Sequence, residues 1–165
     1  MAELTKLEEK VAEVTGLAMA AQTVTDRVLK LTEEEDEDLA AALRRQHEEA
    51  AETEARCIEL AGTFDGKKTA ILEEAREVKG KAAEMLATYL DEDADALDGF
   101  EFLTMAEAAE VGHWQVLETM NERARRSEVS ELVDWALPIQ KRHLETVRKA
   151  SLELASEEDP NETSS

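Results

Sequence analysis

Apolar side chains recur at alternating steps of three and four residues over the first 31 positions, and this spacing constrains the fold more than any other feature. The repeat and the positions that widen it are Leu4, Leu7, Val11, Val14, Leu17, Ala18, Ala21, Val24, Thr25, Val28 and Leu31. Side chains at this spacing lie on one face of an α-helix. We therefore expect an amphipathic helix over residues 3–31, which must bury its apolar stripe against other elements.

Helix signals divide the next sixty residues into two further segments. Thr32 and Glu35 have the spacing of a capping box, and Gly62 is a typical helix end, so a second helix is predicted over residues 33–61. A turn with two glycines follows. A third helix is predicted over residues 67–90. Its inward residues are expected to be Ile71, Ala75, Val78, Ala82, Met85 and Tyr89.

The last third of the chain predicts two more helices. The acidic segment 91–98 is either a linker or the first turns of a fourth helix that ends near Ala124. Its predicted inward stripe consists of Phe102, Ala106, Ala109, His113, Val116 and Met120. Ser127 is the predicted N-cap of the fifth helix. This helix is expected either to bend over residues 134–138 or to begin at Pro138, because proline removes a hydrogen bond inside a helix.

The composition agrees with an all-α fold. Gly and Pro total eight of 165 residues, and β-branched runs bounded by turn residues, the usual sign of strands, are absent. Long helices joined by short loops favour antiparallel packing. We expect a single antiparallel bundle of four or five helices over residues 1–157. Residues 158–165 are polar and are expected to form a disordered tail.

The charge balance excludes several classes of partner. The chain carries 40 acidic and 19 basic residues, a net charge of −21, which opposes binding to nucleic acid and to anionic membranes. No apolar run is long enough to span a membrane, and the acidic N-terminus does not resemble a signal peptide. The single cysteine cannot form an intramolecular disulfide. A cytoplasmic protein is expected.

The three histidines are the strongest candidates for chemistry. His47, His113 and His143 each lie near the middle of a different predicted helix, so a bundle with aligned ends would bring them to one level. The sequence EVGHW places Glu110 three residues before His113, and residues at this spacing share a helix face. Burying three imidazoles is unfavourable unless each finds a polar partner, and a shared cation would satisfy all three.

We therefore predict a metal site formed by His47, Glu110, His113 and His143, with Gln140 as a weak or orienting ligand. Iron or manganese is expected, and zinc is an alternative. The competing interpretation is that the histidines are core residues hydrogen-bonded to neighbouring carboxylates and that no metal binds.

The segments EVGHW on the fourth helix and LPIQKRHLETV on the fifth resemble the ferritin-like superfamily, and the likeness covers residues 33–155. The resemblance implies a bundle that binds two iron or manganese ions through carboxylates and two histidines, with Glu-x-x-His on two helices. Glu110 and His113 match this pattern, and Gln140 with His143 matches it in part. Arg44 stands where a carboxylate is expected.

The expected function is thus a ferritin-like metal-binding bundle that handles iron or manganese at a mononuclear or degenerate site. The alternative is a metal-free scaffold or interaction protein without catalytic activity. A homodimer or higher homo-oligomer is expected in either case, and an oligomer could supply missing ligands across a two-fold axis. Hydrolase and nucleotide-dependent activities are disfavoured, because the chain has neither a nucleophile paired with a base nor a glycine-rich phosphate loop.

Overall fold

The fold is described by a computed structural model that covers residues 2–32 and 36–163. Helices are the only regular secondary structure among the described residues, which contain no strand, so the predicted all-α class is confirmed. The helices are α1 (Lys6–Thr32), α2 (Glu37–Ala61), α3 (Lys68–Tyr89), α4 (Ala96–Ala124) and α5 (Ser127–Ser156). Among the described residues, no helix has an apolar stretch long enough to cross a membrane.

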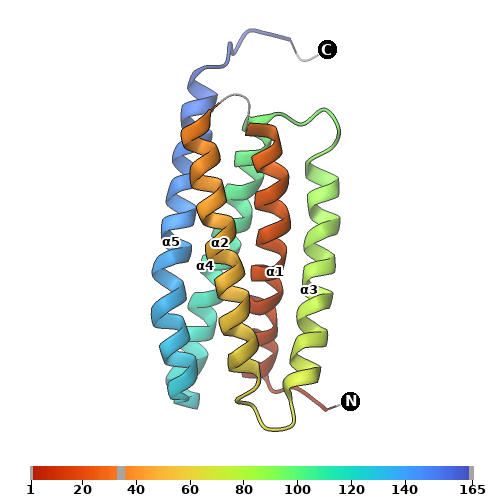
Figure 1. The fold of residues 1–165 in the computed structure, drawn as a ribbon, viewed down its shortest axis with the longest axis vertical. Coiled ribbons are helices and arrows are strands. Elements are labelled where there is room, and N and C mark those ends of the chain that lie inside the picture. The colour runs from red at the N-terminus through yellow and green to blue at the C-terminus, as the bar shows by residue number, and fades with distance from the viewer. Residues whose placement is uncertain (1, 33–35, 164–165) are drawn as a thin grey trace.

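Four of the helices surround a common core, and the other lies outside it (Figure 1). α1 packs against α2 and α4, and α5 packs against the same two helices from the other side. α3 lies at one edge of the molecule, where it contacts α1 and, to a small extent, α2. The chain reverses direction at each loop in Figure 1. The centre of the molecule is therefore enclosed by α1, α2, α4 and α5.

The core consists of two apolar halves. One half lies near the α2–α3 loop and includes Val14, Cys57, Trp114 and Leu117. The other lies near the α3–α4 loop and includes Val28, Leu43, Phe100 and Leu103. Buried polar side chains of α2, α4 and α5 lie between the two halves, among them Gln46, Glu107, Glu110, Gln140 and His143.

The buried face of α4 differs from the predicted one by a rotation of one residue. Phe102 is buried as predicted, but further along the helix the residues that face the core are Leu103, Glu107, Glu110, Trp114, Leu117 and Asn121. Val116, predicted to be inward, is 41% exposed. The predicted stripe did not include Glu107 or Glu110, whereas amide side chains of α2 and α5 hydrogen-bond both glutamates in the core.

The inward face predicted for α3 is correct over only its first half. Ile71 and Ala75 are buried, but Met85 and Tyr89 are 48% and 59% exposed. The reason is the place of α3 at the edge of the bundle, because a helix that packs mainly against one neighbour cannot bury a full stripe.

Several predicted helix ends are also corrected. Thr32, the predicted N-cap of the second helix, is the last residue of α1, and its hydroxyl donates to the Val28 carbonyl. The N-cap of α2 is Asp36, which accepts hydrogen bonds from the backbone amides of Asp38 and Leu39. Glu35, the second member of the predicted capping box, lies outside the described residues. α4 begins after Asp95, so the acidic segment forms both a loop and the first helical turn.

The predicted start of α5 is likewise revised. Ser127 is the first helical residue and not the cap, and the connection is held by Asn121, which accepts from the Arg126 amide and donates to the Ser130 hydroxyl. The helix continues through Pro138 without restarting. Pro138 and Asp134 are both exposed, so solvent can satisfy the Asp134 carbonyl that proline leaves without a donor.

The close contact between α1 and α3 predicts opposite effects for two glycines. A Cβ on Gly16 would lie 2.4 Å from the Ala75 carbonyl oxygen, whereas a Cβ on Gly80 would meet nothing within 4 Å. We expect Gly16→Ala to lower the free energy of unfolding by about 1–3 kcal/mol through overpacking. Gly80→Ala should raise it by up to about 1 kcal/mol. Urea denaturation measures both, and equal effects would contradict the α1–α3 packing.

Candidate functional site

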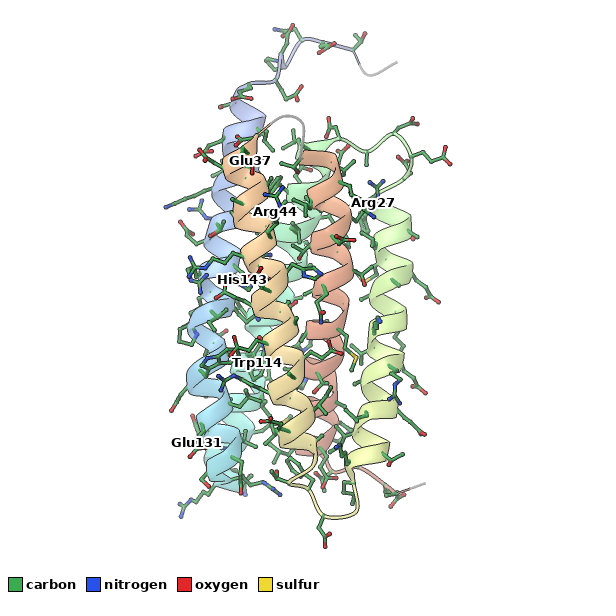
Figure 2. The ribbon with its side chains drawn as sticks, viewed as in Figure 1. Arg27, Glu37, Arg44, Trp114, Glu131 and His143 are labelled. Atoms are coloured by element: carbon green, nitrogen blue, oxygen red, sulfur yellow. The ribbon has the colours of Figure 1, made fainter. Side chains whose placement is uncertain are left out.

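Three helices each contribute an i, i+3 pair of polar side chains to the middle of the core. α2 contributes Gln46 and Glu49, α4 contributes Glu107 and Glu110, and α5 contributes Gln140 and His143. We call these six residues the polar layer. Residues three apart share a helix face, so each helix directs both members of its pair inward. Figure 2 shows His143 at about the mid-length of the bundle, with Trp114 nearer the α2–α3 loop.

Amide side chains join the two carboxyl groups of α4. Gln46 donates from Nε2 to Glu107 Oε1 at 2.8 Å. With its amide nitrogen facing α4, Gln140 donates to Glu110 Oε2 at 2.7 Å and to Glu107 Oε2 at 3.1 Å. Both glutamines are almost fully buried. The two amides therefore hold the carboxyl groups of Glu107 and Glu110 in place from two sides.

His143 links the carboxyls of α2 and α4. Its side chain is 3% exposed, with Nε2 lying 3.2 Å from Glu49 Oε1 and Nδ1 lying 3.8 Å from Glu107 Oε2. Burial lowers the pKa of His143, and the neighbouring Glu49 carboxylate opposes that shift only in part. A neutral imidazole is the form in which histidine accepts a proton or binds a metal.

Glu49 differs from the other carboxyls because it has a cationic partner. Arg142 donates from Nη1 to Glu49 Oε1 at 2.8 Å and from Nη2 to Oε2 at 2.5 Å. These hydrogen bonds lower the pKa of Glu49 to about 2. Glu49 is thus ionised at neutral pH, and its charge is balanced by the arginine.

Glu107 and Glu110 lack such a partner. Their exposed fractions are 1% and 4%, and neither forms an ion pair with a lysine or arginine of the described residues. Burial raises the pKa of both carboxyls, and their proximity to each other raises that of Glu110 further. Two carboxyls in this state either hold protons at neutral pH or require a cation to ionise.

The predicted ligands are divided between two places. Glu110, Gln140 and His143 belong to the polar layer. His113 faces α1 instead, where Nδ1 lies 2.8 Å from Glu13 Oε1 and 3.2 Å from Lys10 Nζ, and its side chain is 35% exposed. The Lys10 ammonium would oppose a metal ion at this position. His47 is half-buried on α2 and forms no hydrogen bond or ion pair with the layer among the described residues.

Within the described parts of the chain, no three His, Cys, Asp or Glu side chains are grouped closely enough to hold a metal ion. The donor types of the polar layer nevertheless suit a metal, since carboxylate and imidazole groups converge from three helices. Sequence reasoning missed Gln46, Glu49 and Glu107. The signal that could have revealed them is the shared i, i+3 spacing of the pairs on α2, α4 and α5.

An apolar groove extends toward the layer from the side of α3. It has a volume of about 100 Å³, and Glu107 and Glu110 contribute to its lining. Its other walls include Leu17, Ala21, Met85, Phe102 and Ala109. The groove lies between α1, α3 and α4, and the two glutamates form part of its wall.

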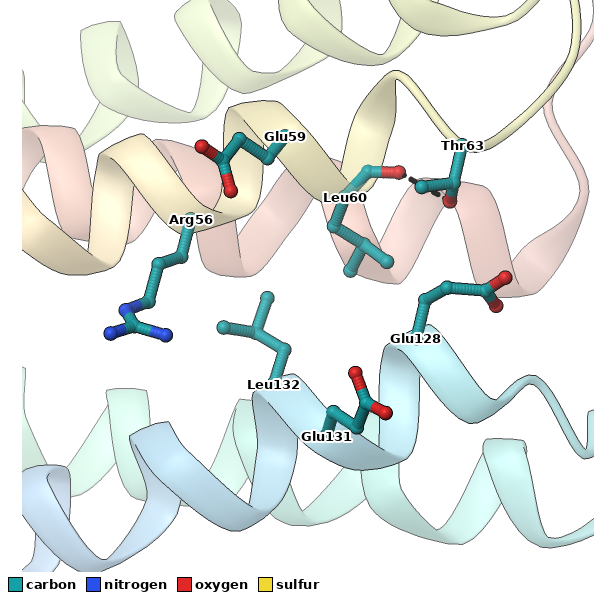
Figure 3. Close-up of a pocket in the computed structure, with 7 residues that line it drawn as sticks. All are labelled: Arg56, Glu59, Leu60, Thr63, Glu128, Glu131 and Leu132. Atoms are coloured by element: carbon teal, nitrogen blue, oxygen red, sulfur yellow. Dashed lines mark hydrogen bonds between the residues drawn. The ribbon is translucent and has the colours of Figure 1, made fainter.

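A second hollow, between the end of α2 and the start of α5, is a different kind of surface (Figure 3). Its carboxylates, Glu59, Glu128 and Glu131, are all exposed to solvent. Arg56 lies beside them, with its guanidinium 4.1 Å from the centre of the Trp135 ring. Solvated carboxylates near an arginine are an ordinary charged surface, so we assign no site there.

Comparisons with known proteins do not identify the chain. No protein-family model matches it, and no curated protein or solved structure matches it either. The candidate site therefore depends on the geometry and charge of the polar layer.

Proposed function

We propose that the protein is a ferritin-like antiparallel bundle that binds a metal ion at the polar layer, with Glu107, Glu110 and His143 as ligands that would have to move closer together than they lie in this structure. The observation that carries this proposal is the burial of two neighbouring carboxyls that have no lysine or arginine partner among the described residues. Carboxyls in this environment are unfavourable as anions, and a bound cation would supply the missing positive charge. His143, neutral because of its burial, would complete the donor set.

The chemistry of these donors favours iron or manganese. Carboxylate oxygens suit hard divalent ions, and imidazole suits iron and zinc. Gln46 and Gln140 would orient the carboxylates through their amide hydrogens, as groups outside the ligand set do in many metal sites. Arg142 would hold Glu49 as an ionised neighbour of His143. The metal, when bound, would supply Lewis acidity, and iron or manganese would also supply redox chemistry.

Part of the ferritin-like resemblance gains support from the layer. In that superfamily, i, i+3 pairs on facing helices supply the ligands. Gln140 and His143 have this spacing on α5, and Glu107 and Glu110 have it on α4. The predicted ligands His47 and His113 are not included in the proposed site, because neither contacts the polar layer.

A metal-free protein is the alternative, and one observation favours it. The Glu107 and Glu110 carboxyls already have amide partners in Gln46 and Gln140. If both carboxyls hold protons, the layer is a neutral hydrogen-bond network that specifies how the helices pack. The protein would then act through its surface.

Elemental analysis of untagged protein after exposure to Fe²⁺, Mn²⁺ or Zn²⁺ and removal of free metal distinguishes the two. We expect near-stoichiometric metal in the wild type and in the control variant His47→Ala/His113→Ala. The variant Glu107→Gln/Glu110→Gln should lose the metal, since the substitutions keep the shape of the side chains and remove their charge. A metal-free wild type would support the alternative. Loss of metal in the control variant would indicate that His47 or His113 is a metal ligand.

A further inference from the structure

The outward surface of α4 is unusual in this chain because it carries no charge over its central four turns. Charged residues make up 36% of the sequence, yet between Phe102 and Leu117 the only ones are Glu107 and Glu110, and both are buried. The exposed positions in this segment are Met105, Ala108, Ala109, Gln115 and Val116. Absence of charge is what distinguishes the centre of a protein–protein interface from the remaining surface.

The spacing of these outward residues has the form of a helix-packing seam. Met105, Ala109, Gly112, Val116 and Thr119 follow one another at steps of four, three, four and three. We call these five residues the outer seam of α4. Alternating steps of three and four are typical of a stripe that packs along a second helix. The inward stripe of α4, which runs from Leu103 to Asn121, is already covered by the other helices.

Gly112 lies at the centre of the outer seam, and no contact within its own chain requires a glycine there. A Cβ added there would meet nothing within 4 Å, whereas a Cβ on Gly99 would lie 2.9 Å from Val28. A glycine inside a helix is destabilising relative to alanine. A second helix that approaches α4 closely at this point would account for it, because small residues allow close contact between helices.

We propose that two copies of this chain associate through the outer seams of α4, packed antiparallel about a two-fold axis near Gly112. The seam extends seven residues to either side of Gly112, so in that orientation it pairs with itself, with Met105 opposite Thr119 and Ala109 within one residue of the level of Val116. Two chains that each carry a charge of −21 repel one another, and the uncharged face lets them approach without opposing carboxylates. A basic partner would instead be attracted to the acidic surfaces elsewhere.

The distribution of exposed apolar residues agrees with this interface. Among the described residues, the large hydrophobic side chains that remain exposed are Met85, Tyr89, Met105, Val116 and Leu152. The first four belong to α3 and α4. The groove between these two helices continues the apolar surface beside the outer seam. Contiguous apolar surface of this kind marks a site of association.

Light scattering over a series of protein concentrations tests the proposal. The wild type should have twice the 18.3 kDa mass of one chain. Gly112→Arg should reduce the mass to that of one chain, because two guanidinium groups would meet at the axis. Gly80→Arg is the matched control, since Gly80 is also open to solvent but lies among charged residues of α3, and it should remain a dimer. A monomeric wild type, or a dimeric Gly112→Arg, would overturn the proposal.

Two further measurements keep the test decisive. Val116→Glu gives the same expected monomer if Gly112→Arg does not fold, because Val116 is already 41% exposed in one chain. Metal content should be unchanged in both variants, since Gly112 and Val116 lie outside the polar layer. The interface and the metal site can therefore fail independently. Loss of metal together with an unchanged mass would count against the interface.

Discussion

Glu107→Gln is expected to stabilise the metal-free protein at neutral pH. Burial raises the pKa of Glu107 from 4.5 to about 8, so the folded state keeps a proton that the unfolded state releases at pH 7. Each pKa unit corresponds to about 1.4 kcal/mol, and the cost to the folded state at pH 7 is on the order of 3 kcal/mol. Glutamine has the same shape, accepts the Gln46 hydrogen bond and carries no such cost.

The raised pKa of Glu107 makes the free energy of unfolding of the wild type depend on pH. Between pH 4.5 and 8 the folded state binds one more proton at Glu107 than the unfolded state, so this contribution to stability is lost as the pH rises through that range. Glu49 acts in the opposite direction, and its contribution is lost as the pH falls from 4.5 toward 2. The lowered pKa of His143 likewise reduces stability below the usual pKa of histidine.

Urea denaturation in the presence of a chelator, repeated across pH 5–8, measures the prediction. The free-energy difference between Glu107→Gln and wild type should grow by about 1.4 kcal/mol per pH unit. Glu54→Gln is a suitable control, because Glu54 is only half-buried and accepts a hydrogen bond from Gln22. A difference that does not vary with pH would show that Glu107 is ionised in the folded protein and has an unrecognised cationic partner.

Trp114→Ala is the second substitution with a large expected effect, and it should lower the free energy of unfolding by about 3–5 kcal/mol. The Trp114 side chain is fully buried among Val14, Cys57 and Leu117, next to the polar layer. Its Nε1 has no hydrogen-bond partner in the part of the chain that the structure describes, so the contribution of this residue to stability comes from packing and not from its polar atom. Removing the indole leaves a cavity that the helices cannot close without moving.

Trp135→Ala provides the matched comparison. Trp135 is only partly buried, and its ring contacts the Arg56 guanidinium at the surface between α2 and α5. An exposed cation–π contact contributes about 0.5–1 kcal/mol, so the loss should be well below that for Trp114. Chemical denaturation followed by circular dichroism measures both variants without depending on tryptophan fluorescence. Equal losses would indicate that Trp114 is not the centre of the core half assigned to it.

The sequence predicted the helices more accurately than it predicted which residues face inward. The three-and-four repeat from Leu4 to Leu31 is sufficient to specify α1, because every side chain in that stripe is apolar or small. On α4 the same reasoning chose the stripe that contains Ala109 and Val116. The core uses the adjacent stripe, which contains Glu107 and Glu110. Which of two such stripes is buried depends on partners in other helices, and a single helix does not contain that information.

The same dependence on neighbouring helices explains why only one of the three histidines points into the polar layer. Their position along the bundle follows from residue number, and all three were expected at mid-length. Their direction around each helix depends on packing, and only His143 points into the polar layer. His113 is three residues after Glu110, but the rotation of α4 turns it toward Glu13 and Lys10. Gln46 and Gln140 hydrogen-bond the two glutamates in the rotation that α4 adopts. Of these two glutamines, the sequence indicated only Gln140, through its spacing from His143.

The most direct test of the proposed metal site is anomalous diffraction from crystals of the protein soaked in Mn²⁺. We expect one dominant anomalous peak enclosed by Glu107, Glu110 and His143, and we expect it to be absent from crystals of Glu107→Gln/Glu110→Gln. A peak beside His113 and Glu13, or wild-type crystals with ordered Glu107 and Glu110 side chains and no peak between them, would contradict the proposal that these carboxyls hold a cation.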